Sequence, residues 1–550
     1  MESIVTKPNF ILILADDMGF SDLGCYGSEI NTPNLDSLAT NGIRFSQMYN
    51  SARCCPSRAS LLTGLNPQQT GVGHMVNSYT RPDGSVIPGY QGYLNNNCAT
   101  IAEVLRLNGY KTFMSGKWHV GGGYDLLNPN GWTPGAETHP IPTQRGFDRF
   151  FGIVAGGGNY FHPLTLMEDD HLINIDTSDF YLTDAISDNA VSMIEESSKS
   201  EEPFFLHVAY TAPHWPLHAL EEDIAKYEGR YRDGWDNLRT NRHEELNGMG
   251  ILDSQWEISP RDPSSMPWDE VRNADWEDLR MAVYAAMVDR MDQGIGKILS
   301  KIKELSIDDN TVVMFLSDNG GCAEFLAEDS SFPTPSKYST PTPDGRKVEV
   351  GNRLDLRPGP DDTFMSYDLP WANASNSPFR LFKRWTHEGG ISTPFVISWP
   401  SRIKKSSIVH EPTHIMDISA TIYDAAGVFY PKEINDYSII PLEGCSFIEA
   451  IDNGSWSRDK PILWEHEGNR AMRDGEWKIV SEIGKGWEIY NMSSDRTELH
   501  DLVDGERERV NVMANIYVEW MKRCEIEPWP ISPMKWDPGF NKPHAHWVAQ

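Results

Sequence analysis

The stretch Asn9-Phe10-Ile11-Leu12-Ile13-Leu14-Ala15-Asp16-Asp17 indicates the fold class. Its apolar residues follow one another without alternation, and such a run predicts a strand buried on both faces of a covered, largely parallel sheet. Two carboxylates follow directly after this strand. Ligands of α/β sheets bind in the crevice beyond the carboxyl ends of the strands. The stretch therefore predicts an α/β fold with Asp16 and Asp17 in a binding crevice.

Further strands and helices alternate along the chain. We expect strands at 43–45, 110–114, 204–210, 311–316 and 394–399, and helices at 34–42, 99–109 and 276–305. The strand at 311–316 also ends in polar residues, Ser317-Asp318-Asn319. This alternation of β and α units is typical of the α/β class.

The texture of the sequence changes from about residue 436. Residues 470–480 predict a hairpin around Asp474-Gly475, followed by a short strand at 487–492 and a helix near 505–524. We therefore predict two units, a catalytic domain over 1–435 and a small C-terminal subdomain over 436–550 made of an antiparallel sheet and one helix.

Two segments look like insertions into the α/β scaffold. Residues 217–275 are charged and rich in Trp, and residues 322–380 are rich in Pro, Asp, Ser and Asn. Long loops on such scaffolds are commonly lids or walls that set specificity. Plain surface elaboration explains any single residue in them equally well.

The charge balance excludes some classes of partner. The 550 residues carry 48 Lys and Arg against 79 Asp and Glu, a net charge of −31. Such acidity argues against nucleic acid or an anionic membrane as the main partner. An anionic substrate must then be captured by local positive groups and a metal ion.

The cellular location of the protein can be inferred from its targeting signals and its cysteines. No run of about twenty apolar residues predicts a membrane span, and residues 1–8 show no signal peptide. The seven cysteines are scattered and do not form a disulfide framework. We expect a cytoplasmic monomer, with a periplasmic location as the alternative if a signal peptide has been removed.

The polar residues after the two apolar strands are candidate metal ligands. Asp16, Asp17, Asp318 and Asn319 offer carboxylate and amide oxygens, which Ca²⁺ accepts at loose geometry. Such dipeptides are common in turns and helix caps, but their position after two apolar strands favours a metal site. No histidine stands beside either pair, which argues against zinc or iron.

The stretch Cys54-Cys55-Pro56-Ser57-Arg58-Ala59-Ser60-Leu61-Leu62-Thr63-Gly64 predicts a helix that begins near Cys54. Pro56 suits a first helical turn, and unpaired N–H groups at a helix start favour negative charge. Arg58 lies one turn further on the same face. This geometry describes an anion site with a modifiable thiol; the alternative is a buried cysteine pair at the start of an ordinary helix.

This run resembles the maturation signature of type I sulfatases, Cys-x-Pro-Ser-Arg-x-x-x-Leu-Thr-Gly. The resemblance implies that a formylglycine-generating or anaerobic sulfatase-maturating enzyme converts Cys54 to formylglycine (3-oxoalanine), whose hydrated aldehyde is the nucleophile. Leu65 stands where the family often has arginine, a minor departure.

Other segments resemble the family in the family's order. Gly116-Lys117-Trp118-His119, Ala212-Pro213-His214-Trp215-Pro216 and the segment 382–390 match its lysine and histidine segments. The resemblance implies that Arg58, Lys117 and Lys383 hold the sulfate, that His214 is the general acid and that His119 is the base of the second step. Singly, each of these residues is more often a structural lysine or histidine; their joint appearance supports the resemblance.

The resemblance also implies the fold and the metal. It implies an alkaline-phosphatase-like fold, a large mixed and mostly parallel sheet sandwiched by helices, with a small antiparallel C-terminal subdomain. In this family the calcium, or sometimes magnesium, would be held by Asp16, Asp17, Asp318, Asn319 and the modified Cys54. His162 and His387 either contact the active site or its substrate, or have a purely structural role.

The expected activity is hydrolysis of sulfate monoesters, aryl or related, to an alcohol or phenol and inorganic sulfate. The segments around residues 145–152 and 379–383 resemble the bacterial arylsulfatase branch. The substrate is then a small-molecule or glycan sulfate ester. A phosphonate monoester or phosphodiester hydrolase with the same site is the alternative, followed by a catalytically silent binding protein and by a thiol hydrolase that uses Cys54 unmodified.

Overall fold

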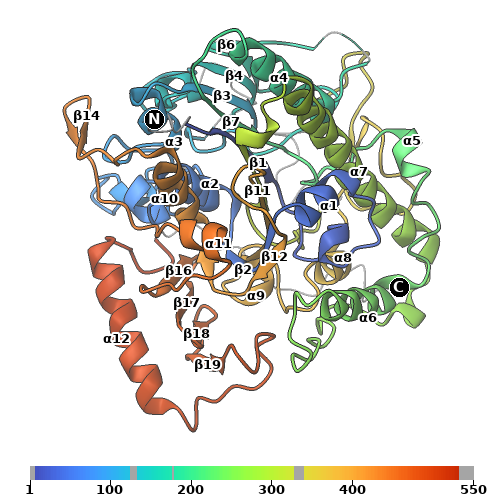
Figure 1. The fold of residues 1–550 in the computed structure, drawn as a ribbon. Coiled ribbons are helices and arrows are strands. Elements are labelled where there is room, and N and C mark those ends of the chain that lie inside the picture. The colour runs from blue at the N-terminus through green and yellow to red at the C-terminus, as the bar shows by residue number, and fades with distance from the viewer. Residues whose placement is uncertain (1–6, 124–132, 176, 178, 327–339, 532–550) are drawn as a thin grey trace.

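The computed structural model describes residues 7–123, 133–175, 177, 179–326 and 340–531. Its centre is an 11-stranded sheet with the order β12-β2-β11-β8-β1-β7-β3-β4-β5-β6, with β13 beside β2 (Figure 1). The strands are β1 (Asn9–Ala15), β2 (Ile43–Tyr49), β3 (Lys111–Gly116), β4 (Arg149–Ile153), β5 (Leu166–Glu168), β6 (His171–Leu172), β7 (Phe204–Ala209), β8 (Thr311–Ser317), β11 (Ser392–Ser398), β12 (Ser407–Val409) and β13 (Thr413–His414).

The middle of the sheet is parallel. Strands β8, β1, β7, β3 and β4 pair in parallel, whereas β11 runs antiparallel to both β8 and β2. The mixed, mostly parallel sheet confirms the predicted fold class. The predicted strands and helices differ from the observed ones by a few residues at their ends. Strands β4, β5, β6, β12 and β13 of this sheet were not predicted.

Helices cover both faces of the sheet because its central strands are apolar on both sides. Ile11 and Ile13 pack with α1, α4 and α7, whereas Leu12 and Leu14 pack with α2, α3 and α10 (Figure 1). These helices are α1 (Pro33–Thr40), α2 (Cys54–Thr63), α3 (Ile101–Leu107), α4 (Leu182–Ser197), α7 (Ala274–Glu304) and α10 (Ile415–Ala426).

The first predicted insertion is largely packed structure. It contains α5 (Glu221–Ile224) and α6 (Gly234–Gly248), and α6 lies against α8 (Asp368–Ser375). Trp235, Trp268 and Trp371 meet edge to face, with ring centroids 4.7–5.8 Å apart. Trp235 and Trp268 of this segment therefore build a core between α6 and α8 with Trp371 of the second segment. The second segment contributes the short strands β9 (Glu349–Val350) and β10 (Thr363–Phe364).

A four-stranded antiparallel sheet follows near the C-terminus. It consists of β16 (Ile462–His466), β17 (Asn469–Asp474), β18 (Trp477–Ser481) and β19 (Glu488–Asn491), and α12 (Arg507–Arg523) packs on one face. Its other face packs on residues at the end of β2. Strand β16 was not predicted. The division of the chain at 435/436 stays a prediction, and the part of the predicted subdomain after residue 531 lies outside the described residues.

Shorter elements complete the chain. They are α9 (Glu388–Ile391), α11 (Ile448–Asn453), β14 (Glu433–Ile434) and β15 (Tyr437–Ser438). Among the described residues, no helix combines the length and the apolar character that crossing a membrane requires.

Candidate active site

The carboxyl ends of β1 and β8 bring four polar side chains together. The two strands are parallel neighbours in the register Ala15↔Ser317, so the residues that follow them meet at one edge of the sheet. The backbone N–H of Asp17 donates to Asp318 Oδ1 at 3.2 Å, and Asn319 Nδ2 donates to Asp17 Oδ1 at 2.7 Å. Together with Asp16 these side chains are fully buried or nearly so.

Helix α2 begins at this cluster. Its N-cap, Arg53, is extended, Cys54 is its first residue, and the left-handed Gly64 ends it. Arg58, one turn into the helix, places Nη2 2.8 Å from Asp318 and 3.4 Å from Asp16. Because Arg58 is 1 % exposed, its charge is held against these carboxylates with little screening by water.

Lys117 and His119 follow β3. Gly116, at the end of that strand, has φ +123°, and a Cβ there would lie 1.9 Å from the carbonyl oxygen of Ala209. Only glycine therefore lets the chain turn here. The turn puts Lys117 Nζ 2.5 Å from Asp16 Oδ2, and His119 Nε2 lies 3.3 Å from Cys55 Sγ.

His214 and Lys383 approach the cluster from its other side. Lys383 Nζ lies 2.8 Å from the Asp17 carboxylate, and His214 Nε2 lies 3.5 Å from Asp17 Oδ2. His214 Nδ1 lies 2.6 Å from the carbonyl oxygen of Trp215. A carbonyl only accepts, so Nδ1 carries the proton and Nε2 is the atom directed at the carboxylates.

Several residues around the site that are not glycine have a left-handed backbone conformation. Such residues cost about 1–3 kcal/mol each and gather at functional sites. They are Asp17, Ala52, His119, Leu381 and Arg384. The N–H of Arg384 donates to the carbonyl oxygen of Ala52 at 2.7 Å, which ties the Lys383 segment to the segment that precedes Cys54.

Burial and neighbouring charges shift the ionisation of these groups. Burial would raise the pKa of Asp16, but the charges of Lys117 and His214 outweigh it and hold that pKa low. Burial lowers the pKa of His119 to about 4 and lowers that of His214 as well. A hydrogen bond from the Cys55 thiol holds the pKa of Cys54 well below its usual range, against the effect of burial.

The cluster has the properties of a site for a hard cation. Asp16 Oδ1 and Asn319 Oδ1 are buried and have no hydrogen-bond partner among the described residues. Burial and the charge of Asp16 raise the pKa of Asp318 well above its usual range, so negative charge here is under-compensated. Carboxylate and amide oxygens suit Ca²⁺ or Mg²⁺, and the residues present therefore fit such an ion.

A histidine lies beside the acidic cluster in space, although none lies beside it in the sequence. No histidine neighbours the acidic pairs in sequence, yet Asp16, Asp17 and His214 offer ligand atoms within 4.8 Å of one another. The structure thus supplies a histidine that the sequence does not show. The remaining donors are all oxygens, so the set still suits a hard cation better than zinc.

The structure brings the predicted residues to one place and leaves two histidines apart. Arg58, Lys117, Lys383 and His214 all contact the acidic cluster. His387 is fully buried, with Nε2 3.6 Å from Glu488 of the C-terminal sheet. His162 lines a separate cavity with Phe161 and Asp361. Neither has a described contact with Cys54.

Three charged residues near the site were not singled out from the sequence. A cavity of about 240 Å³ beside Lys383 is also lined by Arg53, Glu324 and Arg384. Arg53 directly precedes Cys54 and Arg384 directly follows Lys383, so adjacency to predicted site residues could have marked both as candidates. Glu324 lies in the second predicted insertion, where no motif marks it.

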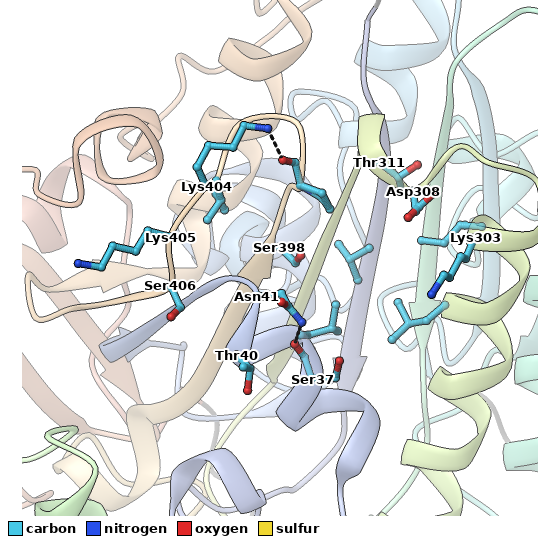
Figure 2. Close-up of a pocket in the computed structure, with 16 residues that line it drawn as sticks. Ser37, Thr40, Asn41, Lys303, Asp308, Thr311, Ser398, Lys404, Lys405 and Ser406 are labelled. Atoms are coloured by element: carbon cyan, nitrogen blue, oxygen red, sulfur yellow. Dashed lines mark hydrogen bonds between the residues drawn. The ribbon is translucent and has the colours of Figure 1, made fainter.

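Another cavity lies at the opposite ends of the same strands. It has about 530 Å³ and is lined by the start of β8, the end of β11 and Lys303, Lys404 and Lys405 (Figure 2). The three ammonium groups lie apart in Figure 2, and Lys404 Nζ donates to the carbonyl oxygen of Pro400 at 2.8 Å. The lysines therefore do not converge on one point.

Comparisons with known proteins agree with this geometry. The profile of the family described as Sulfatase matches residues 8–428, and one described as N-sulphoglucosamine sulphohydrolase, C-terminal, matches residues 379–523. The chain is 34 % identical to an arylsulfatase of Klebsiella aerogenes over 462 residues, 80 % of this chain and 91 % of that protein. It is 32 % identical to an uncharacterized sulfatase of Schizosaccharomyces pombe over 98 % of both chains.

Solved structures resemble the chain over most of its length. The crystal structure of Ps i-CgsB has a TM-score of 0.64 and 26 % identity, with 94 % of this chain and 92 % of that chain covered. A protein solved in complex with its substrate D-glucosamine-2-N,6-O-disulfate has a TM-score of 0.61 at 19 % identity, and covers 96 % of this chain. The second likeness concerns the fold alone.

Proposed function

The chain belongs to the sulfatase family and is a hydrolase of sulfate esters, and on that premise we propose that a modified Cys54 and a divalent cation carry out the reaction. One observation carries the proposal. Cys54 begins a helix at the point where three buried carboxylates meet the cations Arg58, Lys117 and Lys383. A sulfate monoester is an anion, and its hydrolysis needs this combination of charge and nucleophile.

We assign the cation to the acidic cluster. Asp16, Asp17, Asp318 and Asn319 would hold Ca²⁺ or Mg²⁺, and the unpartnered oxygens of Asp16 and Asn319 support this. When bound, the ion would supply positive charge to a sulfate oxygen and favour ionisation of an attacking hydroxyl.

We assign the nucleophile to the formylglycine form of Cys54. The signature over residues 54–64 and the position of Cys54 at the cluster support it. A formylglycine-generating or anaerobic sulfatase-maturating enzyme would make this modification. The hydrated aldehyde would offer one hydroxyl for attack and keep a second, which an unmodified cysteine or serine lacks.

The surrounding side chains would bind the sulfate and move protons. Arg58, Lys117 and Lys383 form a preorganised set of donors for the charged oxygens. His214 faces the carboxylates with Nε2, because Nδ1 is engaged with the carbonyl of Trp215. This Nε2 would take up a second proton as the anionic substrate binds and pass it to the leaving oxygen. His119, whose pKa burial lowers to about 4, is neutral near pH 7 and would accept a proton as the base of the second step.

The rivals have less support. The family and the relatives named above are sulfatases, which disfavours a phosphonate monoester or phosphodiester hydrolase. A protein that binds a ligand without catalysis would not need metal ligands, cations for the sulfate and two histidines for proton transfer in one place. A thiol hydrolase would have no use for three carboxylates beside its thiolate.

The test is a paired measurement on calcium-loaded, matured protein. We expect kcat/KM for 4-nitrophenyl sulfate to exceed that for an aryl phosphonate monoester by at least a hundredfold. Mass spectrometry of the peptide that contains residue 54 should show the mass of the formylglycine form and not that of the unmodified cysteine. A preference for the phosphonate, or unmodified Cys54 in fully active protein, would contradict the proposal.

A further inference from the structure

The cavity beside Lys383 carries charged side chains that the proposed reaction does not use. Arg53 precedes Cys54 and Arg384 follows Lys383 in the chain, so the cavity wall continues directly from the residues that would hold the sulfate. Glu324 lines the same wall. This cavity is therefore placed to receive the alcohol part of the substrate, which leaves when the ester is cleaved.

Glu324 joins the two sides of the site. Its Oε1 lies 2.9 Å from Arg53 Nη2, next to the nucleophile, and its Oε2 accepts the indole N–H of Trp215 at 2.9 Å, next to His214. Glu324 is 7 % exposed. A carboxylate buried to this degree is stable only with such partners, so its position is fixed before a substrate arrives.

Each cation of the cavity wall is paired with an acidic side chain. Arg53 pairs with Glu324 and Lys383 pairs with Asp17, at 2.9 and 2.8 Å. Arg384 pairs with Glu467. In the part of the chain that the structure describes, every cation lining this cavity thus has an acidic partner. Lys383 is assigned to the sulfate that is cleaved, and the two remaining cations, Arg53 and Arg384, are compensated. Asp262 and Glu482 also line the cavity, so a second sulfate or carboxylate on the leaving group would meet no uncompensated cation there.

Unused hydrogen-bonding capacity remains on the same wall. Arg53 Nε is buried and has no hydrogen-bond partner among the described residues. Each oxygen of Glu324 has one donor, whereas a carboxylate oxygen accepts about two. A donor and acceptors side by side match two neighbouring hydroxyls, and the half-buried indole of Trp385 lines the cavity with an apolar face.

We propose that Arg53 and Glu324 select leaving groups that are uncharged and carry neighbouring hydroxyls, as in monosulfates of neutral sugars or polyols, over leaving groups with a second anionic group. This inference rests on the proposed sulfatase reaction. A buried donor and a buried acceptor favour a ligand whose hydroxyls pair with both. A ligand that leaves either one unpaired, or that carries a charge repelled by the acceptor, binds more weakly.

The first experiment measures inhibition, which reports binding whether or not a sugar is cleaved. Hydrolysis of 4-nitrophenyl sulfate by the matured, calcium-loaded enzyme is competed by the 6-sulfates of glucose and galactose and by their 3,6-disulfates. We expect at least one monosulfate to have an inhibition constant tenfold or more below that of its disulfate. Equal or tighter inhibition by both disulfates, or no inhibition by either monosulfate, would overturn the inference.

The second experiment assigns the selection to the Arg53–Glu324 pair. In Glu324→Gln we expect the inhibition constant of the monosulfate to rise at least tenfold more than KM for 4-nitrophenyl sulfate, while the discrimination against the disulfate shrinks because Arg53 is no longer balanced. Arg53→Lys, which keeps the charge and loses Nε, should show the first effect without the second. Glu519→Gln, the same change at an exposed pair with Lys522, is the matched control.

The outcomes separate this inference from the proposed function. If Glu324→Gln raises both constants by the same factor, Glu324 has only a structural part and the inference is wrong while the sulfatase reaction stands. If the wild-type protein does not hydrolyse 4-nitrophenyl sulfate at all, the proposed function fails, and the inference falls with it.

Discussion

The ammonium group of Lys383 lies 2.8 Å from the carboxylate of Asp17, although 366 positions separate the two residues in the chain. Burial would lower the pKa of Lys383, but Asp17 raises it well above its usual range, so this lysine stays charged at any working pH. A permanently charged donor against the acidic cluster is what binding of an anion requires.

Removal of the Lys383 charge should weaken binding of the charged sulfate oxygens of the substrate. We expect Lys383→Ala to lower kcat/KM for 4-nitrophenyl sulfate by about 10²–10³, as loss of one preorganised donor does. Lys297→Ala removes an exposed lysine paired with Asp188 and serves as the control. A loss below threefold in Lys383→Ala would show that Lys383 does not hold the sulfate.

Cys54→Ser tests the need for a second hydroxyl. We expect this variant to release at most one equivalent of 4-nitrophenol per protein and then stop, because serine has no second hydroxyl to expel sulfate. Stopped-flow absorbance and the mass of the intact protein measure both parts. The control is Cys445→Ser at a half-buried thiol away from the cluster. Multiple rapid turnovers by Cys54→Ser would contradict the assignment.

Calcium should stabilise the folded protein through the acidic cluster. An ion that binds only the native state adds about 2.7 kcal/mol at a concentration one hundred times its Kd, so Tm should rise on addition of CaCl2 after treatment with EGTA. Differential scanning calorimetry measures this without reference to activity. Asp318→Ala should abolish the rise and Asp188→Asn, an exposed acid, should keep it; an equal rise in both would place the calcium elsewhere.

His414 predicts a dependence of stability on pH. Its Nδ1 accepts the N–H of Met416 at the start of α10 and its Nε2 lies 3.2 Å from the carbonyl oxygen of Asn50, so the neutral ring has no site for another proton. Burial lowers its pKa from 6.5 to about 3. The unfolded chain therefore binds this proton first, and the free energy of unfolding falls as pH drops from 6.5 towards 3.

The expected loss from His414 is about 2–3 kcal/mol between pH 7 and 4.5, measured by urea unfolding. His414→Asn keeps an acceptor at the N-cap and should flatten the pH dependence by that amount. The matched control is His171→Asn, the same change at an exposed histidine. Parallel pH profiles for His414→Asn and wild type would refute the argument.

Buried charges join the C-terminal sheet to α9, the short helix that leads into β11 of the large sheet. Lys478 Nζ lies 2.8 Å from both Glu388 and Glu498, and all three side chains are fully buried. Lys478→Met leaves two buried carboxylates short of positive charge and should lower the free energy of unfolding by about 3–5 kcal/mol. Lys485→Met, in the connection between β18 and β19 and at an exposed pair, should change it by less than about 1 kcal/mol. Similar losses in both variants would be inconsistent with this account.

The parts of the site that follow an apolar strand could be predicted from the sequence. The run before Asp16 and the run before Asp318 each signal a buried strand, and parallel pairing then brings their ends together. The signature from Cys54 to Gly64 is local and marks the start of α2. These signals are short-range, so a linear reading finds them.

The cavity wall could not be predicted in this way. Glu324 meets Arg53 across 271 positions, and no periodicity or motif links them. Strand β16 was missed because its apolar run, Ile462-Leu463-Trp464, is only three residues long before Glu465. His214 comes close to Asp17 through the turn after β7, a contact that only the fold creates.

The burial of Cys54 sets an order of events in the life of the chain. Its side chain is 1 % exposed, at the start of a helix that is buried along its whole length, so the proposed maturation enzyme would have to reach it before α2 packs. Under the proposed function, maturation and folding would then compete for the same polypeptide. The ratio of these two rates would set the fraction of active molecules, and a chain that folded first would stay inactive until it unfolded again.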